Sequence, residues 1–458
     1  MKHDELHLWF LADPTRPRCV GRLRLVDAGK GVSLQYTGSW LSDGFALSED
    51  LPLGDIEYLP RWKGMAVGAV DDARPDRWGE RVIQFLDKPA RLSLMEYLYC
   101  AGDERFGALG VSTSADAYRP RATSPLPRLG QVQVLSEIVR KVSAREPVNE
   151  LERKMLATGG SFGGAKPKAL IELGGEQWVI KFFNDEPIDV PLIEHAAMTL
   201  AALAGIRVAQ TRVIALLGEH ALAVRRFDRD VDRDVDRDLE DEVKGEVQSA
   251  GQRRIHCISA GTALRAQAIA GQEPELGYPG LAQLLRRAGV LEDDPQAGEG
   301  AANLQDMQEL FRRMVFNILI DNTDDHEKNH ALMVVAPTRQ GRYRLAPAYD
   351  VLPTNSGQGH QEFIVGDDQR DSTLANAMSQ CELFGYPRMQ AARQVARVIQ
   401  VVDGWRDHFA ACGVTRKDLD SLAERIDGEP LLSQRRSFKP ADYVASARAP
   451  KRRSPFTQ

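Results

Sequence analysis

The chain has 458 residues, too many for one ordinary core, and this length predicts two or three packed subdomains. Hydrophobic residues make up 43% and charged residues 27%, and a formal net charge of -6 argues against a surface that binds nucleic acid throughout. No apolar run approaches the roughly 20 residues that span a bilayer, and acidic residues stand where a signal peptide would be positive, so we expect a cytoplasmic protein without a membrane partner. Five scattered cysteines without a C-x-x-C pair predict neither a disulfide framework nor a cysteine-based zinc site.

The first part of the chain has the pattern of a β-rich subdomain. Three segments with β-branched and aromatic residues, separated by Pro, Gly and Asp turns, predict strands at 6–12, 20–26 and 32–37. Apolar residues then recur at helical spacing in 75–86 and 92–99. A proline-rich stretch at 118–127 marks a linker, so we place the N-terminal subdomain at residues 1–115.

The next region, 150–257, has the plan of a small nucleotide-binding lobe. A helical stretch at 132–157 leads to a Gly-rich turn at 159–164. The elements predicted after the turn follow in the order strand, strand, helix, strand, strand, at 169–173, 177–183, 190–204, 211–216 and 221–227. Two strands, a helix and two more strands are the order expected of such a lobe.

An Asp-Arg-Asp-Val repeat occupies residues 228–242. Its alternating carboxylates are reminiscent of a calcium loop, but the EF-hand pattern needs Gly at its sixth position, where this sequence has Arg233 or Arg237. We therefore expect a solvated insertion.

The remaining chain predicts a helical catalytic lobe at 258–430, in which the amphipathic helix at 304–320 is the clearest element. A basic tail follows at 431–458, and we expect a solvated end there rather than a nucleic-acid patch. Together with the β-rich start, these regions predict an α+β protein.

Lys181 is the first residue with the chemistry of phosphoryl transfer, which needs a phosphate cradle, a cation, metal-holding carboxylates and a carboxylate near the attacking hydroxyl. It lies in a predicted strand with apolar neighbours, where a lysine must reach solvent or meet an anion because burying its charge alone is costly. Glu194, thirteen residues on, lies in the following helix and is a candidate partner. Taken alone, a lysine in such a strand is more often an ordinary edge-strand lysine than a phosphate ligand.

The segment Asn322-Thr-Asp-Asp-His-Glu-Lys-Asn329 is more specific. Asp324 and Asn329 stand five positions apart, the D-x-x-x-x-N spacing of protein-kinase catalytic loops, whereas Asp325 would give the wrong spacing. In such loops the Asp accepts or orients the proton of the substrate hydroxyl and the Asn is a magnesium ligand. Asp350, twenty-one residues after Asn329, follows a strand-like run and is placed to hold the metal ion on the phosphates. Lysine, then Asp and Asn, then Asp is the order that a kinase requires.

A rival motif overlaps this loop, because His326-Glu-Lys-Asn-His330 matches the H-E-x-x-H pattern of zinc hydrolases. Zinc would need both histidines on one face of a continuing helix and a third ligand downstream, for which His360 is a candidate. The motif falls between the end of a predicted helix and a predicted strand at 331–336, so we expect that its histidines do not converge.

The Gly-rich turn from Gly159 to Lys168 is neither a P-loop nor a G-x-G-x-x-G motif. Glycines allow positive φ and let backbone N–H groups approach phosphate, and Lys166 and Lys168 add positive charge. By itself the segment is equally well explained as a tight turn. Its place just before the Lys181 strand makes it a candidate phosphate loop.

These motifs together resemble the HipA toxin serine/threonine kinases, and the likeness covers most of the chain. The catalytic loop and Ser161-Phe-Gly-Gly-Ala-Lys-Pro-Lys168 are the most specific segments, and Arg226-Phe-Asp-Arg229 and Leu345-Ala-Pro-Ala-Tyr-Asp350 add to them. The resemblance implies a protein-kinase-like two-lobe α+β fold, with a β-rich N-terminal subdomain, a nucleotide-binding lobe and a mainly helical C-terminal lobe.

The resemblance also implies a role for each matching residue, with ATP and Mg²⁺ as cofactors. Asp324 would be the catalytic carboxylate with His326 beside it, and Asn329 and Asp350 would bind magnesium. Ser161 would be autophosphorylated, which in this family ejects the loop and switches the kinase off, as an added charge of about -2 is able to do. The residues implied to hold the nucleotide are Gly163, Gly164, Ala165, Lys166, Lys168 and Lys181, with Arg225, Arg226 and Phe227 as the adenine hinge.

The family's partners are implied as well. Its kinases pair with a small helix-turn-helix, HipB-like antitoxin, so DNA would be bound only indirectly, and characterised members phosphorylate an aminoacyl-tRNA synthetase. This chain departs from the pattern at Arg225, where better-known members have Glu, in the inserted repeat, and at 253–260, which matches only some members. A non-catalytic scaffold for an antitoxin and operator DNA is the alternative to an active kinase, but every catalytic position is filled.

Overall fold

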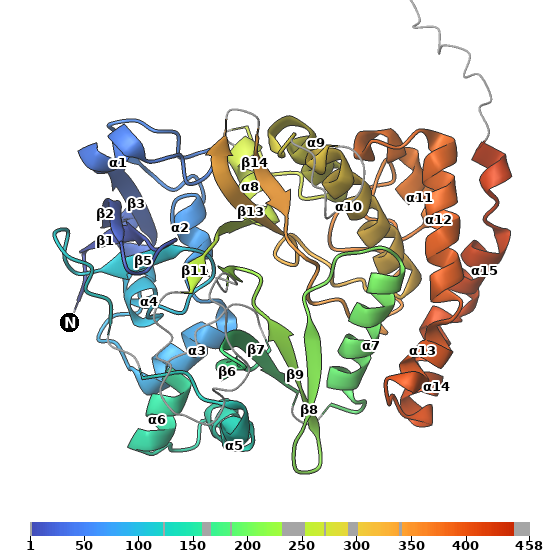
Figure 1. The fold of residues 1–458 in the computed structure, drawn as a ribbon, viewed down its shortest axis with the longest axis horizontal. Coiled ribbons are helices and arrows are strands. Elements are labelled where there is room, and N and C mark those ends of the chain that lie inside the picture. The colour runs from blue at the N-terminus through green and yellow to red at the C-terminus, as the bar shows by residue number, and fades with distance from the viewer. Residues whose placement is uncertain are drawn as a thin grey trace, which may run out of the picture.

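The computed structural model describes residues 2–121, 124–157, 166–183, 186–230, 252–269, 272–291, 301–338 and 341–443. Figure 1 shows the N-terminal sheet on one side of the molecule, a second sheet below the centre and the C-terminal helices on the opposite side. In the described ranges, no helix is both long and apolar enough to cross a membrane.

The N-terminal sheet has the strand order β4-β3-β2-β1-β5, and its neighbouring strands are antiparallel. Its strands are β1 (Glu5–Phe10), β2 (Arg18–Val26), β3 (Gly31–Tyr36), β4 (Glu57–Tyr58) and β5 (Leu109–Ser112). The register places Leu6 opposite Leu23 and Leu23 opposite Leu34. All three side chains are fully buried, so they fix which face of the sheet packs inward. The helices of this part are α1 (Gly38–Asp43), α2 (Ala69–Asp72), α3 (Arg77–Leu86) and α4 (Leu94–Cys100).

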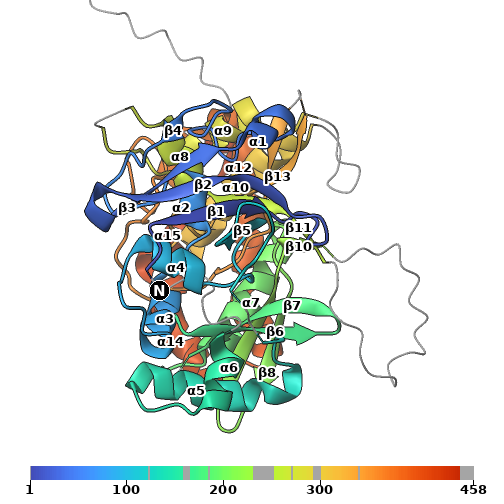
Figure 2. The same ribbon diagram turned by 90° about the vertical axis from the view of Figure 1, so that its left-hand side faces the viewer.

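The second sheet has the strand order β6-β7-β9-β8, and Figure 2 shows β6 and β7 below the N-terminal sheet. Its strands are β6 (Lys168–Leu173), β7 (Glu176–Phe182), β8 (Thr211–Ala215) and β9 (His220–Arg225). Gly174 and Gly175 join β6 to β7 with φ of 62° and 74°, the left-handed conformation that a two-residue hairpin turn needs. The accompanying helices are α5 (Val132–Ala144), α6 (Glu150–Ala157) and α7 (Val190–Leu203).

Both faces of this second sheet are buried. Along β9, Ala221 and Ala223 belong to a small apolar cluster that also contains residues of α3 and α5. Leu222 and Val224 belong to the large core that contains α7 and the C-terminal helices. Successive side chains of a strand point to opposite faces, so this alternation places one face of the sheet on each cluster.

The C-terminal part combines helices with a small sheet of order β12-β13-β14, formed by His256–Ser259, Ala331–Thr338 and Gly341–Leu345. A two-stranded ribbon of β10 (Arg229–Asp230) and β11 (Arg253–Arg254) precedes it. The central helix is α10 (Ala302–Leu319), whose side chains are buried on almost every side. The other helices are α8 (Ala260–Gln267), α9 (Tyr278–Ala288), α11 (Leu374–Ser379), α12 (Arg388–Val402), α13 (Trp405–Ala411), α14 (Arg416–Ile426) and α15 (Glu429–Ser437).

Most of the predicted elements appear within one or two residues of their expected ends. The helical stretch predicted at 132–157 is divided into α5 and α6, because Arg145 adopts a left-handed φ of 59° and ends α5. The predicted boundary between 257 and 258 falls inside β12, which pairs with β13 of the C-terminal part.

Candidate active site

Lys181 forms the centre of the site. Its ammonium Nζ lies 2.6 Å from Glu194 Oε1 of α7 and 2.5 Å from Asp350 Oδ1. We call these three residues the lysine centre. Burial acts to raise the pKa of Asp350, but the charges of Lys181 and Lys168 outweigh it and lower the pKa to about 2. The Asp350 side chain is nevertheless 47% exposed, so one carboxylate of the centre remains accessible to a ligand.

Of the two further lysines of the predicted phosphate loop, Lys168 lies beside this centre. Lys168 begins β6 directly opposite Lys181 in β7 and is buried. Burial, and then the charge of Lys181, lower the pKa of Lys168 to about 8. Lys166 is exposed, and its Nζ lies 2.7 Å from Glu186 Oε1. Ser161, Gly163, Gly164 and Ala165 lie outside the described residues, as does the repeat from 231 onward.

The predicted catalytic loop follows α10. Asp321 has a left-handed φ of 57° and ends the helix, and the chain then runs as turns to β13. Asp324 is exposed on this loop, and its pKa is raised, first by partial burial and then by the nearby charges of Asp350 and Glu362. A carboxylate with a raised pKa is a better proton acceptor at neutral pH.

Asp325, the neighbouring carboxylate, is instead a buried structural group. It accepts a hydrogen bond from the Tyr278 hydroxyl, and one of its oxygens lies 2.8 Å from His330 Nε2. Burial acts to raise the pKa of Asp325, but His330 and these hydrogen bonds lower it. Of the two adjacent aspartates, only Asp324 therefore faces solvent.

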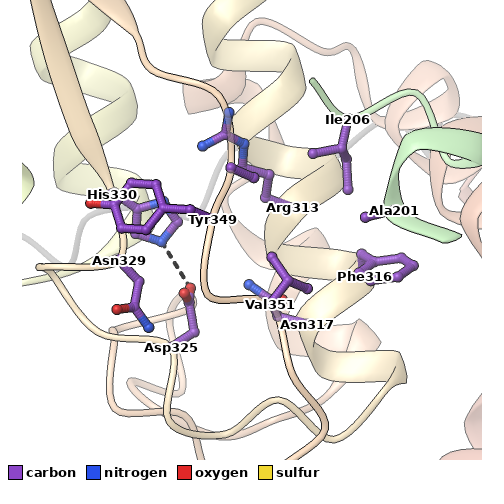
Figure 3. Close-up of a pocket in the computed structure, with 11 residues that line it drawn as sticks. Ala201, Ile206, Arg313, Phe316, Asn317, Asp325, Asn329, His330, Tyr349 and Val351 are labelled. Atoms are coloured by element: carbon purple, nitrogen blue, oxygen red, sulfur yellow. Dashed lines mark hydrogen bonds and ion pairs between the residues drawn. The ribbon is translucent and has the colours of Figure 1, made fainter. Parts of the chain in front are cut away.

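One hydrogen bond connects the loop to the segment after β14 that carries Asp350, and another lies within the loop. The Tyr349 hydroxyl donates to the Lys328 carbonyl over 2.7 Å, and Asn329 Nδ2 donates to the Asp324 carbonyl over 3.4 Å. Figure 3 shows Asn329 next to Asp325 and below the rings of His330 and Tyr349. These residues line a small cavity of about 10 Å³, enough for the centre of one water molecule. Amide and carboxylate oxygens are hard ligands, so Asn329 and Asp350 fit the chemistry of Mg²⁺.

The overlapping H-E-x-x-H motif does not form a zinc site. Residues 321–330 are turns rather than a helix, so the two histidines do not share a helix face. His326 Nδ1 accepts from the Lys328 amide over 3.1 Å, whereas His330 is buried, bonded to Asp325 and stacked on Phe363. Within the ranges that the structure describes, no group of three His, Cys, Asp or Glu residues is arranged to hold a metal ion.

The predicted hinge has three residues with different surroundings. Arg225 ends β9, and its guanidinium lies 2.6 Å from Glu176. Phe227 stacks on Tyr349 with ring centroids 5.4 Å apart, which joins the hinge to the segment that carries Asp350. Arg226 is buried and bonds Asp228 through Nε and Nη2 over 2.9 and 2.7 Å. Its side chain is therefore occupied, and its backbone N–H donates to the Gln177 carbonyl over 3.1 Å.

Arg226 belongs to a buried set of charges that the sequence did not reveal. We call it the hinge cluster, and its members are Glu104, Arg226, Asp228, Arg229 and Arg254. Arg229 Nη1 also donates to the Gly107 carbonyl over 3.0 Å, so the cluster attaches the hinge to the N-terminal subdomain. Spacing along the chain gives no sign of it, because its members are up to 150 positions apart.

Comparisons with known proteins support one family. The sequence model of the HipA-like C-terminal domain matches residues 160–405, more than half of the chain. The structure is similar to that of HipA from Shewanella oneidensis MR-1, solved with HipB and operator DNA, with a TM-score of 0.58 and 17% identity over 92% of this chain and 95% of that one. No curated protein matches the chain.

A proinflammatory kinase of Helicobacter pylori, CtkA, is 13% identical over 61% of this chain and 95% of its own, and its TM-score of 0.35 is too low to establish a common fold. The match to the Shewanella structure confirms the predicted α+β, protein-kinase-like fold of two lobes with a β-rich N-terminal part. Because the family model covers more than half of its residues, this chain belongs to the HipA-like family.

Proposed function

We propose that the protein is an ATP- and magnesium-dependent serine/threonine protein kinase, acting as the toxin of a type II toxin-antitoxin pair in the cytoplasm. The observation that carries the proposal is the lysine centre, in which one strand lysine contacts both a buried helix glutamate and the half-exposed Asp350. In protein kinases a strand lysine paired with a helix glutamate, and an aspartate that holds the metal ion, must be in place together.

Each residue has one task in this reaction. Lys181, with Lys168 beside it, would bind the phosphates of ATP, and Asn329 and Asp350 would hold magnesium. The metal ion, when bound, neutralises charge on the phosphates. Asp324 would accept the proton of the substrate's hydroxyl group. The oxygen of that hydroxyl would form a bond to the γ-phosphorus of ATP as the bond between this phosphorus and ADP breaks. The exposed position of Asp324 leaves room for a protein substrate.

Partners and self-regulation form the finer part of the proposal. The similar Shewanella protein was solved with HipB and its operator DNA, which supports an antitoxin of that type here, with DNA bound through the complex. We propose Ser161 as the autophosphorylation site and a translation protein such as an aminoacyl-tRNA synthetase as the substrate, both from the family resemblance.

Incubation of the purified protein with magnesium and labelled ATP, followed by mass spectrometry of the phosphorylated peptides, tests the proposal. We expect phosphate on Ser161 in the wild type and none in Asp324→Ala. Asp368→Ala, which removes another exposed aspartate outside the site, is the matched control and should label like the wild type. No label, together with no rise in melting temperature on adding magnesium and ATP, would leave a non-catalytic scaffold as the better account.

A further inference from the structure

Residues 71–80 of the N-terminal subdomain contact both lobes of the proposed kinase. The first contact is made at the end of α2, where Asp72 accepts hydrogen bonds from the backbone N–H and the hydroxyl of Ser259, each over 2.7 Å. Ser259 ends β12, and its side chain caps the first turn of α8. Asp72 therefore attaches α2 to the lobe that carries the catalytic loop.

The second contact is made by α3 with the nucleotide-binding sheet. Trp78 is 1% exposed, and its indole Nε1 donates to the Lys168 carbonyl of β6 over 2.8 Å. Val82 and Leu86, one and two turns further along the helix, belong to the same small apolar cluster as Ala221 and Ala223 on one face of that sheet. These contacts fix the start of α3 relative to the strands that carry Lys168 and Lys181.

Asp76 makes the third contact. It occupies the N-cap position of α3, where an aspartate ordinarily accepts a hydrogen bond from the first turn of its own helix. Its side chain makes no such bond, and its Oδ1 lies 2.6 Å from Lys328 Nζ of the catalytic loop. A carboxylate that forgoes its local cap for a partner 252 positions away indicates a contact with a role between segments.

The contact between Asp76 and Lys328 affects the turn that presents Asn329, because Lys328 is part of that turn. Lys328 directly precedes Asn329, and its carbonyl accepts the hydrogen bond from Tyr349, next to Asp350. Glu327 is held at the same time by Arg265 of α8 over 2.8 Å. The turn that presents Asn329 is thus held from one side by α8 and from the other by Asp76.

We propose that Asp76 is a positioning residue of the phosphoryl-transfer site, which fixes the catalytic loop relative to the lysine strands by pairing with Lys328 while Trp78 docks on β6. This inference deepens the proposed kinase function and rests on it. The pair is partly exposed, with side chains 25% and 40% accessible, so its contribution to overall stability is small. Its effect is geometric, since small displacements of reacting groups cost large factors in rate.

The test compares Asp76→Asn with the conservative Asp76→Glu and with Glu49→Gln. Glu49 pairs with Arg287 over 2.7 Å and also joins the N-terminal subdomain to the C-terminal lobe, but away from the catalytic loop, so it is the matched control. In Asp76→Asn we expect kcat for phosphoryl transfer to fall about tenfold with KM for ATP unchanged. Amide hydrogen exchange should accelerate in a peptide covering residues 321–330. Asp76→Glu should have a kcat and an exchange rate between those of Asp76→Asn and the wild type. Glu49→Gln should match the wild type in both measurements.

Hydrogen exchange separates this inference from the proposed function, because it needs no catalysis. Wild-type protein without transfer activity would count against the kinase, and exchange alone would then decide the role of Asp76. Unchanged exchange of 321–330 in Asp76→Asn, or the same acceleration in Glu49→Gln, would overturn the inference.

Discussion

The hinge cluster and the lysine centre use the same kinds of side chain for different purposes. In the hinge cluster the side chains of Arg226 and Asp228 are 1% and 2% exposed, and Asp228 accepts from Arg226, Arg229 and the Gly107 amide. In the lysine centre Lys181 is buried, but the carboxylate of Asp350 is 47% exposed. The charges of the hinge cluster are thus paired with one another in the interior, a closed network. The lysine centre is an open network, because its Asp350 carboxylate is accessible to a ligand.

This difference shows which buried charges can act on a substrate. Burial acts to raise the pKa of Asp228, yet Arg226 and Arg229 hold it well below its usual range, so the carboxylate stays ionised and fully occupied. Such a closed network holds segments in register, whereas removing one member leaves an uncompensated buried charge. An open network of similar composition keeps a charged oxygen free for a metal ion or a phosphate. Replacing one aspartate by asparagine in each cluster, Asp350 in the lysine centre and Asp228 in the hinge cluster, tests this distinction.

The largest effect is expected on activity, from Asp350→Asn in the open cluster. The rate of phosphoryl transfer should fall about 10²- to 10³-fold, because the change removes the negative charge proposed to hold the magnesium ion on the transferred phosphoryl group. Asn tolerates the left-handed φ of 58° at this position, and Lys181 keeps Glu194, so the free energy of unfolding should change by less than about 1 kcal/mol. Transfer of labelled phosphate from ATP to the protein and urea unfolding measure the two quantities. If Asp350→Asn lowered the free energy of unfolding strongly but kept the wild-type rate of phosphoryl transfer, Asp350 would be a structural residue, contrary to the role that we assign to it.

The same change in the closed cluster, Asp228→Asn, should act on stability. It leaves Arg226 and Arg229 buried without their shared carboxylate, and we expect a loss of about 3–5 kcal/mol in the free energy of unfolding. Urea unfolding followed by circular dichroism measures the loss, and the remaining folded protein should keep its transfer rate. If the urea midpoint of Asp228→Asn equalled that of the wild type, the hinge cluster would not stabilise the fold.

Arg226→Lys sharpens the comparison, since it retains the charge but removes the planar fork. Lysine cannot reproduce the paired bonds to Asp228 or the bond to the Arg105 carbonyl at 2.8 Å, so about 2 kcal/mol of stability should be lost. Arg225→Lys is the control, because Arg225 is partly exposed and should cost less than about 1 kcal/mol. Equal losses at the two arginines would contradict the special role of the buried fork.

The sequence was sufficient for the parts of the site that depend on local order. The strand of Lys181, the helix of Glu194 and the loop with Asp324 and Asn329 lie where the spacing predicted, because each is set by one element and its immediate ends. The choice of Asp324 over Asp325 rested on spacing alone, and in the structure only Asp324 is exposed.

The contacts that depend on packing of distant segments could not be predicted. Asp76 and Lys328 are 252 positions apart, and nothing in the segment around Asp76 indicates a partner beyond its own helix. The burial of the Arg226 side chain against Asp228 and the Arg105 carbonyl could not be predicted either, and the place of Arg226 in the adenine hinge stays a prediction. Hydrophobic periodicity locates elements but carries no information on which charged side chains meet between them.

The smallest effect concerns Lys168, which differs from Lys181 across the strand pair. Its pKa of about 8 lies below the usual lysine value, so the side chain loses its charge as the pH rises through 8, whereas the carboxylates raise the pKa of Lys181 and keep it charged. KM for magnesium-ATP should therefore rise about threefold between pH 7 and 9, since one of two phosphate cations is lost. In Lys168→Arg, which stays charged, the profile should be flat. Lys166→Arg, at an exposed position paired with Glu186, should keep the wild-type profile, and a flat profile in the wild type would show that Lys168 does not contact the phosphates.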